Sequence, residues 1–288
     1  MMELANFPVD RLCLNDQAQK FSDHGYVVIE NALSPQFVET LRNAVEEIRP
    51  QLETSPHRQP TYGLSVRPMI DKHDAFLDLL YYPTTFPLVV KCLNHYSIQL
   101  MVSHLVEVPP NPDKRHVGWH DDGGLPALTV NGIRAFGSLK IGYSLTDVTG
   151  DDEGQLMVAP GSHRTQGAPP FDGADPIGAQ TVKLRAGDAV LFQQGTWHAA
   201  APNYSDKSRM NLYFGYNYRF MRPIDYDSFS AELIEKCTPI GKQLLGVKAT
   251  HEGYYLPTED DAPLKSWFEQ HFGETSGYTH IKNVALQH

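Results

Sequence analysis

The stretch Gly118-Trp119-His120-Asp121-Asp122-Gly123-Gly124 organises the interpretation of this sequence. In an extended strand, residues i and i+2 point to the same face, so the imidazole of His120 and the carboxylate of Asp122 can converge on one point. A metal ion is the natural occupant of that point, but two protein ligands rarely hold one. The best third ligand is His198, in Gly195-Thr196-Trp197-His198-Ala199-Ala200-Ala201-Pro202-Asn203. Two histidines and a carboxylate form the facial triad of non-haem Fe(II) oxygenases.

Short strands with turns surround these candidate ligands. Phe136 to Val148 alternates, with Leu139, Ile141 and Tyr143 on one face and Ser138, Lys140 and Gly142 on the other. Helical patterns come before and after the strands. This order predicts a mainly β fold with flanking α-helices, a jelly roll or double-stranded β-helix of the cupin type. We expect one domain over residues 1–288, with a helical part (1–97), a jelly-roll core (98–220) and a helical tail (221–288).

Two further segments carry specific structural predictions. Ser34-Pro35 is a strong helix start, and the apolar stripe behind it predicts a helix to about Arg49 that Pro50 ends. The segment Thr165–Gly178 is rich in Gly, Pro and Asp and predicts a long, mobile loop. Either this loop or residues 109–117 is a candidate lid over the site.

Composition limits the classes of partner. The formal net charge of -10 over 288 residues disfavours non-specific nucleic-acid binding, which relies on a basic surface. No signal peptide and no apolar stretch long enough for a membrane span are recognisable. The three cysteines, Cys13, Cys92 and Cys237, lack metal-ligand spacing and suit buried thiols in a reducing compartment. We therefore expect a soluble, cytoplasmic monomer or homodimer that binds a small molecule.

Four motifs in fixed order give the chain a family resemblance. They are His120-Asp121-Asp122, the run Gly154–His163, the run Gly187–Phe192, and the segment from His198 through Pro202-Asn203 to Arg209. In this order they resemble the phytanoyl-CoA dioxygenase (PhyH) family of Fe(II)/2-oxoglutarate-dependent dioxygenases. The correspondence covers roughly residues 25–219, most of the chain.

The resemblance implies roles for individual residues. His120, Asp122 and His198 would bind Fe(II), with 2-oxoglutarate and O₂ at the remaining positions. Arg209, eleven residues after His198, would bind the C5 carboxylate of 2-oxoglutarate with its planar guanidinium fork. Lys140 and Ser103 are weaker candidates for the cosubstrate pocket, followed by His104 and Arg67. In the family, the turn that contains His163 is structural. Trp119 and Trp197 each precede a ligand and should therefore point away from it.

The implied activity is oxidation of an unactivated C–H bond in a small organic molecule, with hydroxylation as the default outcome. An aspartate at position 122 excludes halogenation, which needs that ligand position vacated. Desaturation, cyclisation and epimerisation stay open. The family extends to specialised metabolism, which we favour. Acyl-CoA hydroxylation is an alternative that would call on Lys114, Arg115 and Arg134 at the pocket mouth. A jelly-roll metal enzyme or a binding protein that does not use 2-oxoglutarate are further alternatives.

Overall fold

The computed structural model describes residues 9, 12–55, 63–113, 117–122, 129–130, 133–165, 167–247 and 258–273. The described helices are α1 Leu14–His24, α2 Pro35–Glu53, η4 Asp74–Leu79, α3 Phe86–Leu93, η5 Ser162–Arg164, α4 Ala231–Glu235, α5 Pro239–Leu244 and α6 Leu264–Phe272. The described strands are β1 Tyr26–Ile29, β2 Leu64–Val66, β3 Ile98–Val108, β4 Val117–His120, β5 Thr129–Val130, β6 Ile133–Arg134, β7 Ser138–Ser144, β8 Leu156–Val158, β9 Phe171–Asp172, β10 Asp175–Pro176, β11 Gln180–Val182, β12 Ala189–Gln193, β13 His198–Ala200 and β14 Arg209–Tyr218.

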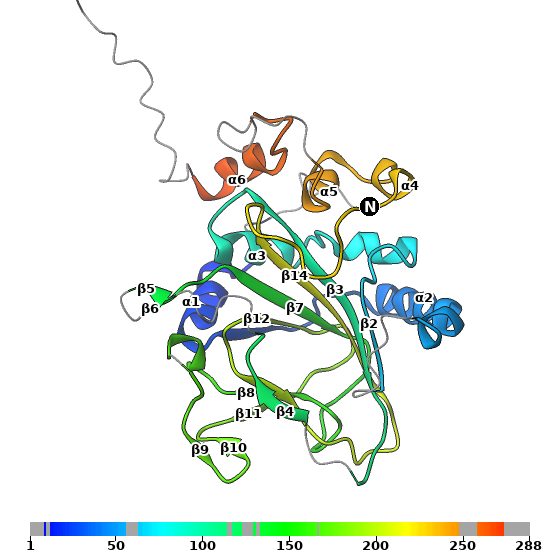
Figure 1. The fold of residues 1–288 in the computed structure, drawn as a ribbon, viewed down its shortest axis with the longest axis vertical. Coiled ribbons are helices and arrows are strands. Elements are labelled where there is room, and N and C mark those ends of the chain that lie inside the picture. The colour runs from blue at the N-terminus through cyan, green and yellow to red at the C-terminus, as the bar shows by residue number, and fades with distance from the viewer. Residues whose placement is uncertain are drawn as a thin grey trace, which may run out of the picture.

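Two antiparallel sheets face each other in the described part of the chain. The larger has six strands in the order β1-β12-β7-β14-β3-β2, and the smaller has four in the order β11-β8-β13-β4. In Figure 1 the larger sheet lies between the smaller sheet and a layer that contains α3, α5 and α6. This is the predicted jelly-roll arrangement with helices outside it.

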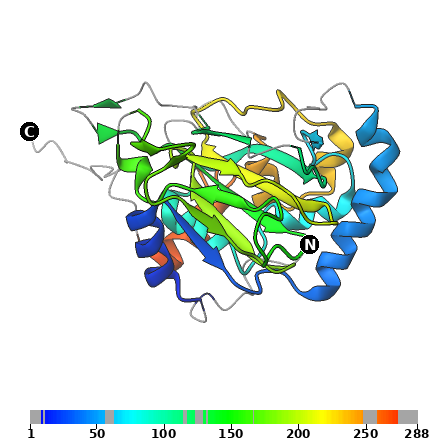
Figure 2. The ribbon, with the colours of Figure 1, turned by 90° about the horizontal axis from the view of Figure 1, so that it is seen from below.

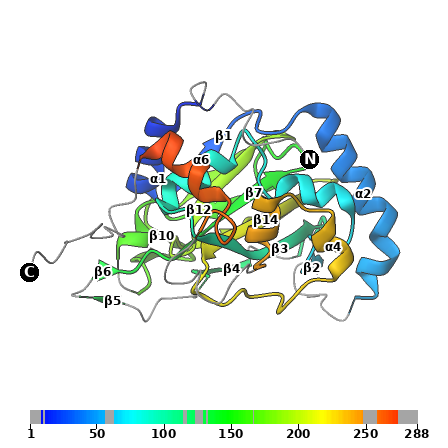
Figure 3. The same cartoon turned by 90° about the horizontal axis from the view of Figure 1, so that it is seen from above.

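The outer face of the larger sheet carries the main hydrophobic core. Leu139, Ile141 and Tyr143 of β7 are buried in the same cluster as apolar residues of α3, α5 and α6. Polar anchors join the layers: the Tyr143 hydroxyl is 2.7 Å from Thr85 Oγ1, and Tyr216 donates a 2.8 Å hydrogen bond to the carbonyl of Leu80. Figure 3 shows α4 and α6 over this face. The alternation predicted for β7 therefore separates a helix-covered face from an inner face.

Helices α1 and α2 flank the sheet at opposite ends in Figure 2. The prediction that Ser34 starts α2 is confirmed, since its Oγ accepts a hydrogen bond from the Phe37 N–H. The predicted end at Pro50 is wrong, because the helix continues to Glu53. Proline removes the hydrogen bond to the carbonyl four residues earlier. One more turn buries Leu52 to 1% exposure, which offsets that loss.

The segment expected to be a long loop contains local structure. Within residues 165–178, β9 pairs with β10 as a two-stranded hairpin. This hairpin is attached to the strand that carries His120, because Trp119 Nε1 donates a 2.7 Å hydrogen bond to Asp175 Oδ1. The described part of the hairpin is thus tied down beside the smaller sheet.

The structure bears on two further expectations, the absence of a membrane span and the burial of the cysteines. No helix in the described residues combines the length and apolar character that a membrane crossing requires. The three cysteines are free thiols, but only Cys237 is buried, whereas Cys92 is partly buried and Cys13 is exposed. The expectation of buried thiols is therefore wrong for Cys13, which stands just before α1 at the surface.

Candidate metal and cosubstrate site

His120, Asp122 and His198 converge at one edge of the smaller sheet. His120 ends β4, His198 begins β13, and the two residues are register partners across the antiparallel pair. Asp122 lies two residues past the end of β4. Its Oδ2 is 3.7 Å from His198 Nε2, and the imidazole centroids are 4.4 Å apart. One ligand atom from each of the three side chains lies within 4.8 Å of the others, so a single metal ion can contact all three.

The main chain sets the tautomer of both histidines in the same way. His120 Nδ1 is 2.9 Å from the carbonyl of Gly118, and His198 Nδ1 is 2.8 Å from the carbonyl of Thr196. A carbonyl oxygen only accepts, so Nδ1 carries the proton in each ring and Nε2 keeps its lone pair. This arrangement is typical of metal-ligating histidines. The donor set therefore fits an ion that accepts two neutral imidazoles and a carboxylate.

Asp122 is held by its backbone and by its side chain. Its N–H donates to the carbonyl of Gln194 at 3.1 Å, and Gln194 Nε2 donates to the Asp122 carbonyl at 3.0 Å. Its Oδ2 accepts a 2.7 Å hydrogen bond from Lys140 Nζ. Burial by itself raises the pKa of Asp122, but the charge and the hydrogen bond of Lys140 outweigh it and hold the pKa well below its usual range. Asp122 is therefore a carboxylate at neutral pH.

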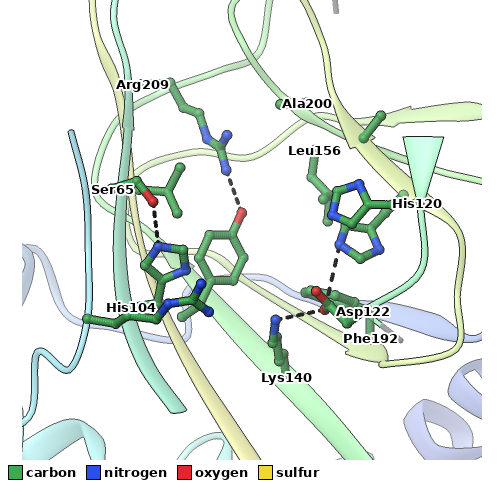
Figure 4. Close-up of a pocket in the computed structure, with 14 residues that line it drawn as sticks. Ser65, His104, His120, Asp122, Lys140, Leu156, Phe192, Ala200 and Arg209 are labelled. Atoms are coloured by element: carbon green, nitrogen blue, oxygen red, sulfur yellow. Dashed lines mark hydrogen bonds and ion pairs between the residues drawn. The ribbon is translucent and has the colours of Figure 1, made fainter. Parts of the chain in front are cut away.

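A cavity of about 270 Å³ separates the two sheets at this point (Figure 4). Its smaller-sheet wall carries the three candidate ligands together with Leu156, Ala199 and Ala200. The larger sheet and the segment that follows β2 supply the remaining lining residues, which are Ser65, Arg67, His104, Val106, Lys140, Phe192, Arg209 and Tyr213. The metal-binding groups and most of the cationic groups thus come from different walls.

Arg209 begins β14 and is only 3% exposed. Its Nη2 donates a hydrogen bond to the hydroxyl of Tyr213, and its guanidinium carbon lies 5.9 Å from the centre of that ring. No carboxylate of the described residues forms an ion pair with it. Buried charges are normally paired. A buried, acid-free guanidinium that lines a cavity fits a site for an anionic ligand.

The other predicted site residues divide by the face of the strand on which they lie. Lys140, His104 and Arg67 line the cavity, whereas Ser103 does not. Successive residues of a strand point to opposite faces of the sheet. Because the side chain of His104 lies on the cavity face of β3, that of Ser103 lies on the opposite face. Ser103 Oγ instead accepts hydrogen bonds from the N–H groups of residues 69 and 70 at 2.9 and 3.0 Å. The prediction that Ser103 binds the cosubstrate is therefore wrong.

Three residues predicted to lie outside the site do so. Neither Trp119 nor Trp197 is among the residues that line the cavity. The ring of Trp197 instead meets Phe171 of β9 edge to face, with centroids 6.3 Å apart. His163 Nε2 is 3.1 Å from the carbonyl of Ser22, which joins its turn to α1 and agrees with a structural role.

The sequence analysis missed two residues that shape the site, Gln194 and Tyr213. Gln194 positions Asp122, and Tyr213 contacts Arg209. A Cβ on Gly142 would lie 2.5 Å from Cε1 of Tyr213, so only glycine leaves room for that ring. Burial lowers the pKa of His104 to about 3, which keeps its imidazole neutral. The only signals in the sequence were the polar pair at positions 193–194 and the glycine in β7, and neither indicates its partner.

Comparisons with known proteins agree with this site. The dioxygenase cdmA of Talaromyces verruculosus is 29% identical over 131 residues, an alignment that covers 44% of this chain and 41% of that protein. The dioxygenase olcK of Penicillium canescens is 21% identical over 88% of this chain and 89% of its own length. The crystal structure of SnoK, a non-haem α-ketoglutarate-dependent carbocyclase from nogalamycin biosynthesis, has the same fold, with a TM-score of 0.59, 22% identity, and coverage of 81% of this chain and 97% of that one.

The sequence profile of the phytanoyl-CoA dioxygenase family matches residues 21–211, about two thirds of the chain. The matched region contains the three candidate ligands and Arg209, the residues around which the cavity is built. The chain belongs to the phytanoyl-CoA dioxygenase (PhyH) family of non-haem iron, 2-oxoglutarate-dependent dioxygenases.

Proposed function

We propose that this protein uses Fe(II) and 2-oxoglutarate to oxidise a C–H bond of a small organic molecule, with hydroxylation as the default outcome. One observation carries the proposal: His120, Asp122 and His198 converge on one wall of a cavity in which Arg209 is buried and has no acidic partner among the described residues. The first feature suits a divalent metal ion, and the second suits the distal carboxylate of a dicarboxylate cosubstrate.

The residues of the chain have distinct roles in this proposal. His120, Asp122 and His198 would hold Fe(II), which supplies oxygen activation coupled to decarboxylation of 2-oxoglutarate to succinate and carbon dioxide. Arg209 would bind the C5 carboxylate of the cosubstrate through its fork of N–H donors. Lys140 already contacts Asp122 and so keeps that carboxylate ionised and oriented. Leu156, Phe192 and Ala200 give the cavity apolar surface that excludes water from the reacting groups.

A role in specialised metabolism is part of the proposal. Its support is the likeness to dioxygenases of two fungi and to a carbocyclase from nogalamycin biosynthesis. The acyl-CoA alternative called on Lys114 and Arg115, which lie outside the described residues, as does the side chain of Arg134. The cavity itself, at about 270 Å³, is at the small end for ligand sites and suits a compact substrate.

Anaerobic titration of the Fe(II)-loaded protein with 2-oxoglutarate, followed by visible absorption, tests the proposal. We expect a weak charge-transfer band that saturates as the cosubstrate chelates the metal. The control is the same titration with succinate, which lacks the keto group and should give no band. If Fe(II) is bound and 2-oxoglutarate gives no band, the cosubstrate has no part in the mechanism and the protein is another kind of metal enzyme.

A further inference from the structure

Arg67, the last of the residues named as candidates for the cosubstrate pocket, lines the same cavity, but the proposed function already assigns the cosubstrate carboxylate to Arg209. It directly follows β2, the edge strand of the larger sheet, and is partly buried. Its guanidinium forms no hydrogen bond or ion pair with any of the residues that the structure describes. Asp225 acts on Arg67 electrostatically but does not form an ion pair with it. Arg67 therefore lines the cavity with donors that no described residue satisfies.

The chain on both sides of Arg67 is fixed. Ser65, two residues earlier and also in the cavity lining, has its Oγ 2.7 Å from His104 Nε2. Beyond Arg67, the backbone N–H groups of Met69 and Ile70 donate hydrogen bonds of 2.9 and 3.0 Å to Ser103 Oγ. These bonds fix the backbone on both sides of Arg67, so a ligand that binds the guanidinium has to order the Arg67 side chain but not the segment that carries it. Ser103, outside the cavity, thus helps to hold Arg67 in place.

Charge balance separates Arg67 from the other cations of the cavity. The described lining residues include three cations, Arg67, Lys140 and Arg209, and one carboxylate, Asp122, while His104 is neutral. Lys140 is paired with Asp122. A divalent metal ion and dianionic 2-oxoglutarate cancel each other, so the loaded cavity keeps an excess of two positive charges. Asp225 acts on Arg67 from outside the cavity lining and forms no ion pair with it. Since Arg209 is assigned to the cosubstrate, Arg67 is the lining cation left for a further anion.

We propose that Arg67 binds an anionic group of the substrate, a carboxylate or a phosphate ester, and so fixes which carbon of the substrate faces the metal. This inference rests on the proposed function, because it assigns the cosubstrate to Arg209. Planar guanidinium groups recognise both anions in bidentate fashion, and the two ligand sources share that chemistry. An anionic substrate also suits a cavity whose charge is opposite in sign to that of the protein, -10 overall.

The test uses protein loaded with Zn(II), which does not turn over, and saturating 2-oxoglutarate. Binding of 4-fluorophenylacetate, 4-fluorophenyl phosphate and neutral 4-fluorophenylacetamide is followed by ¹⁹F NMR line broadening. We expect the wild type to bind an anionic probe more tightly than the amide. Arg67→Gln should lower the affinity for that anionic probe by about tenfold or more. The preferred anionic probe identifies the source as a carboxylate or a phosphate.

Two matched variants sharpen the comparison. Arg67→Lys keeps the charge but loses the fork and should bind the anionic probe with intermediate affinity. Arg222→Gln removes an arginine whose side chain is 81% exposed and paired with Asp227, and it should bind the probes as the wild type does. Equal affinity of wild type and Arg67→Gln for the anionic probes, or no preference of the wild type for them over the amide, would overturn the inference.

Cosubstrate affinity distinguishes failure of this inference from failure of the proposed function. Arg67→Gln should bind 2-oxoglutarate as tightly as the wild type does. A loss of 2-oxoglutarate affinity in this variant would assign Arg67 to the cosubstrate, which overturns the inference and leaves the proposed function standing. If the wild type itself binds no 2-oxoglutarate, both are refuted.

Discussion

Replacement of Arg209 should weaken 2-oxoglutarate binding without destabilising the protein. Arg209 is 3% exposed, so little solvent stands beside it to hydrogen-bond the cosubstrate carboxylate in its place. Each hydrogen bond between charged groups contributes about 1.5–3 kcal/mol, so loss of a two-bond fork should cost about 3 kcal/mol or more, roughly 150-fold in Kd. Arg209→Met, which keeps much of the side-chain volume, should show this loss. Arg209→Lys, which keeps the positive charge but not the planar fork, should bind 2-oxoglutarate about tenfold more weakly than the wild type.

The stability of the same variants tests whether Arg209 serves the cosubstrate or the fold. In the free protein Arg209 is a buried cation without an acidic partner among the described residues, and replacing a buried charge by an apolar side chain of similar volume is often neutral or stabilising. The Tm of metal-free Arg209→Met should therefore equal or exceed that of the wild type. Addition of Zn(II) and 2-oxoglutarate should raise the Tm of the wild type more than that of the variant.

Both quantities come from anaerobic absorption titrations and thermal unfolding, with Arg222→Gln as the exposed control. An unchanged Kd for 2-oxoglutarate in Arg209→Met would refute the assignment of the cosubstrate to Arg209. A lower Tm with an unchanged Kd would show that the arginine belongs to the fold, through its contact with Tyr213.

Three further predictions concern the metal, the cavity wall and pH. His198→Ala should abolish Fe(II) binding, measured by equilibrium dialysis, and retained binding would show that the site is misplaced. Gly142→Ala brings a Cβ to 2.5 Å from Tyr213, and this overpacking should lower the free energy of unfolding by about 1–3 kcal/mol, measured by urea denaturation. Burial raises the pKa of Asp225 to about 6 from 3.8, so the stability that its protonated form contributes is lost as pH rises through 6. Asp225→Asn should therefore be more stable than the wild type at pH 7 by at most about 3 kcal/mol, and the gain should vanish by pH 4; a gain independent of pH would contradict the assignment.

The sequence predicted the features that depend on local periodicity. The alternation predicted over Phe136 to Val148 is confirmed in β7, where Leu139 and Ile141 lie in the core and Lys140 lines the cavity. His120 and Asp122 were expected to converge because they are two residues apart, although Asp122 lies beyond the end of its strand. The predicted third ligand, His198, reaches them through the register of β13 with β4, which no local pattern encodes.

The wrong predictions and the missed residues share one physical cause, because each depends on tertiary contacts that a local sequence pattern does not encode. Ser103 and His104 are adjacent polar residues on one strand, and only the partner strands decide which of them faces the cavity. Pro50 should end a helix by local rules, but burial of Leu52 carries the helix past it. Gln194 contacts Asp122, which is 72 residues away in the sequence, and the ring of Tyr213 fits only because β7 places Gly142 beside it, so the sequence context of Gln194 and Tyr213 gave no indication of a role.

The division of the site between the two sheets bears on how its specificity can change. The orientation of both imidazoles depends on main-chain carbonyls, those of Gly118 and Thr196, within the smaller sheet and its loops. Arg67 and Arg209, which form no ion pair with a carboxylate of the described residues, instead belong to the larger sheet and its edge. A substitution at Arg67 therefore changes the charge that meets the substrate while the hydrogen bonds that orient the histidines stay intact. Because metal binding and anion recognition are separable in this way, the substrate can change while the metal chemistry is retained.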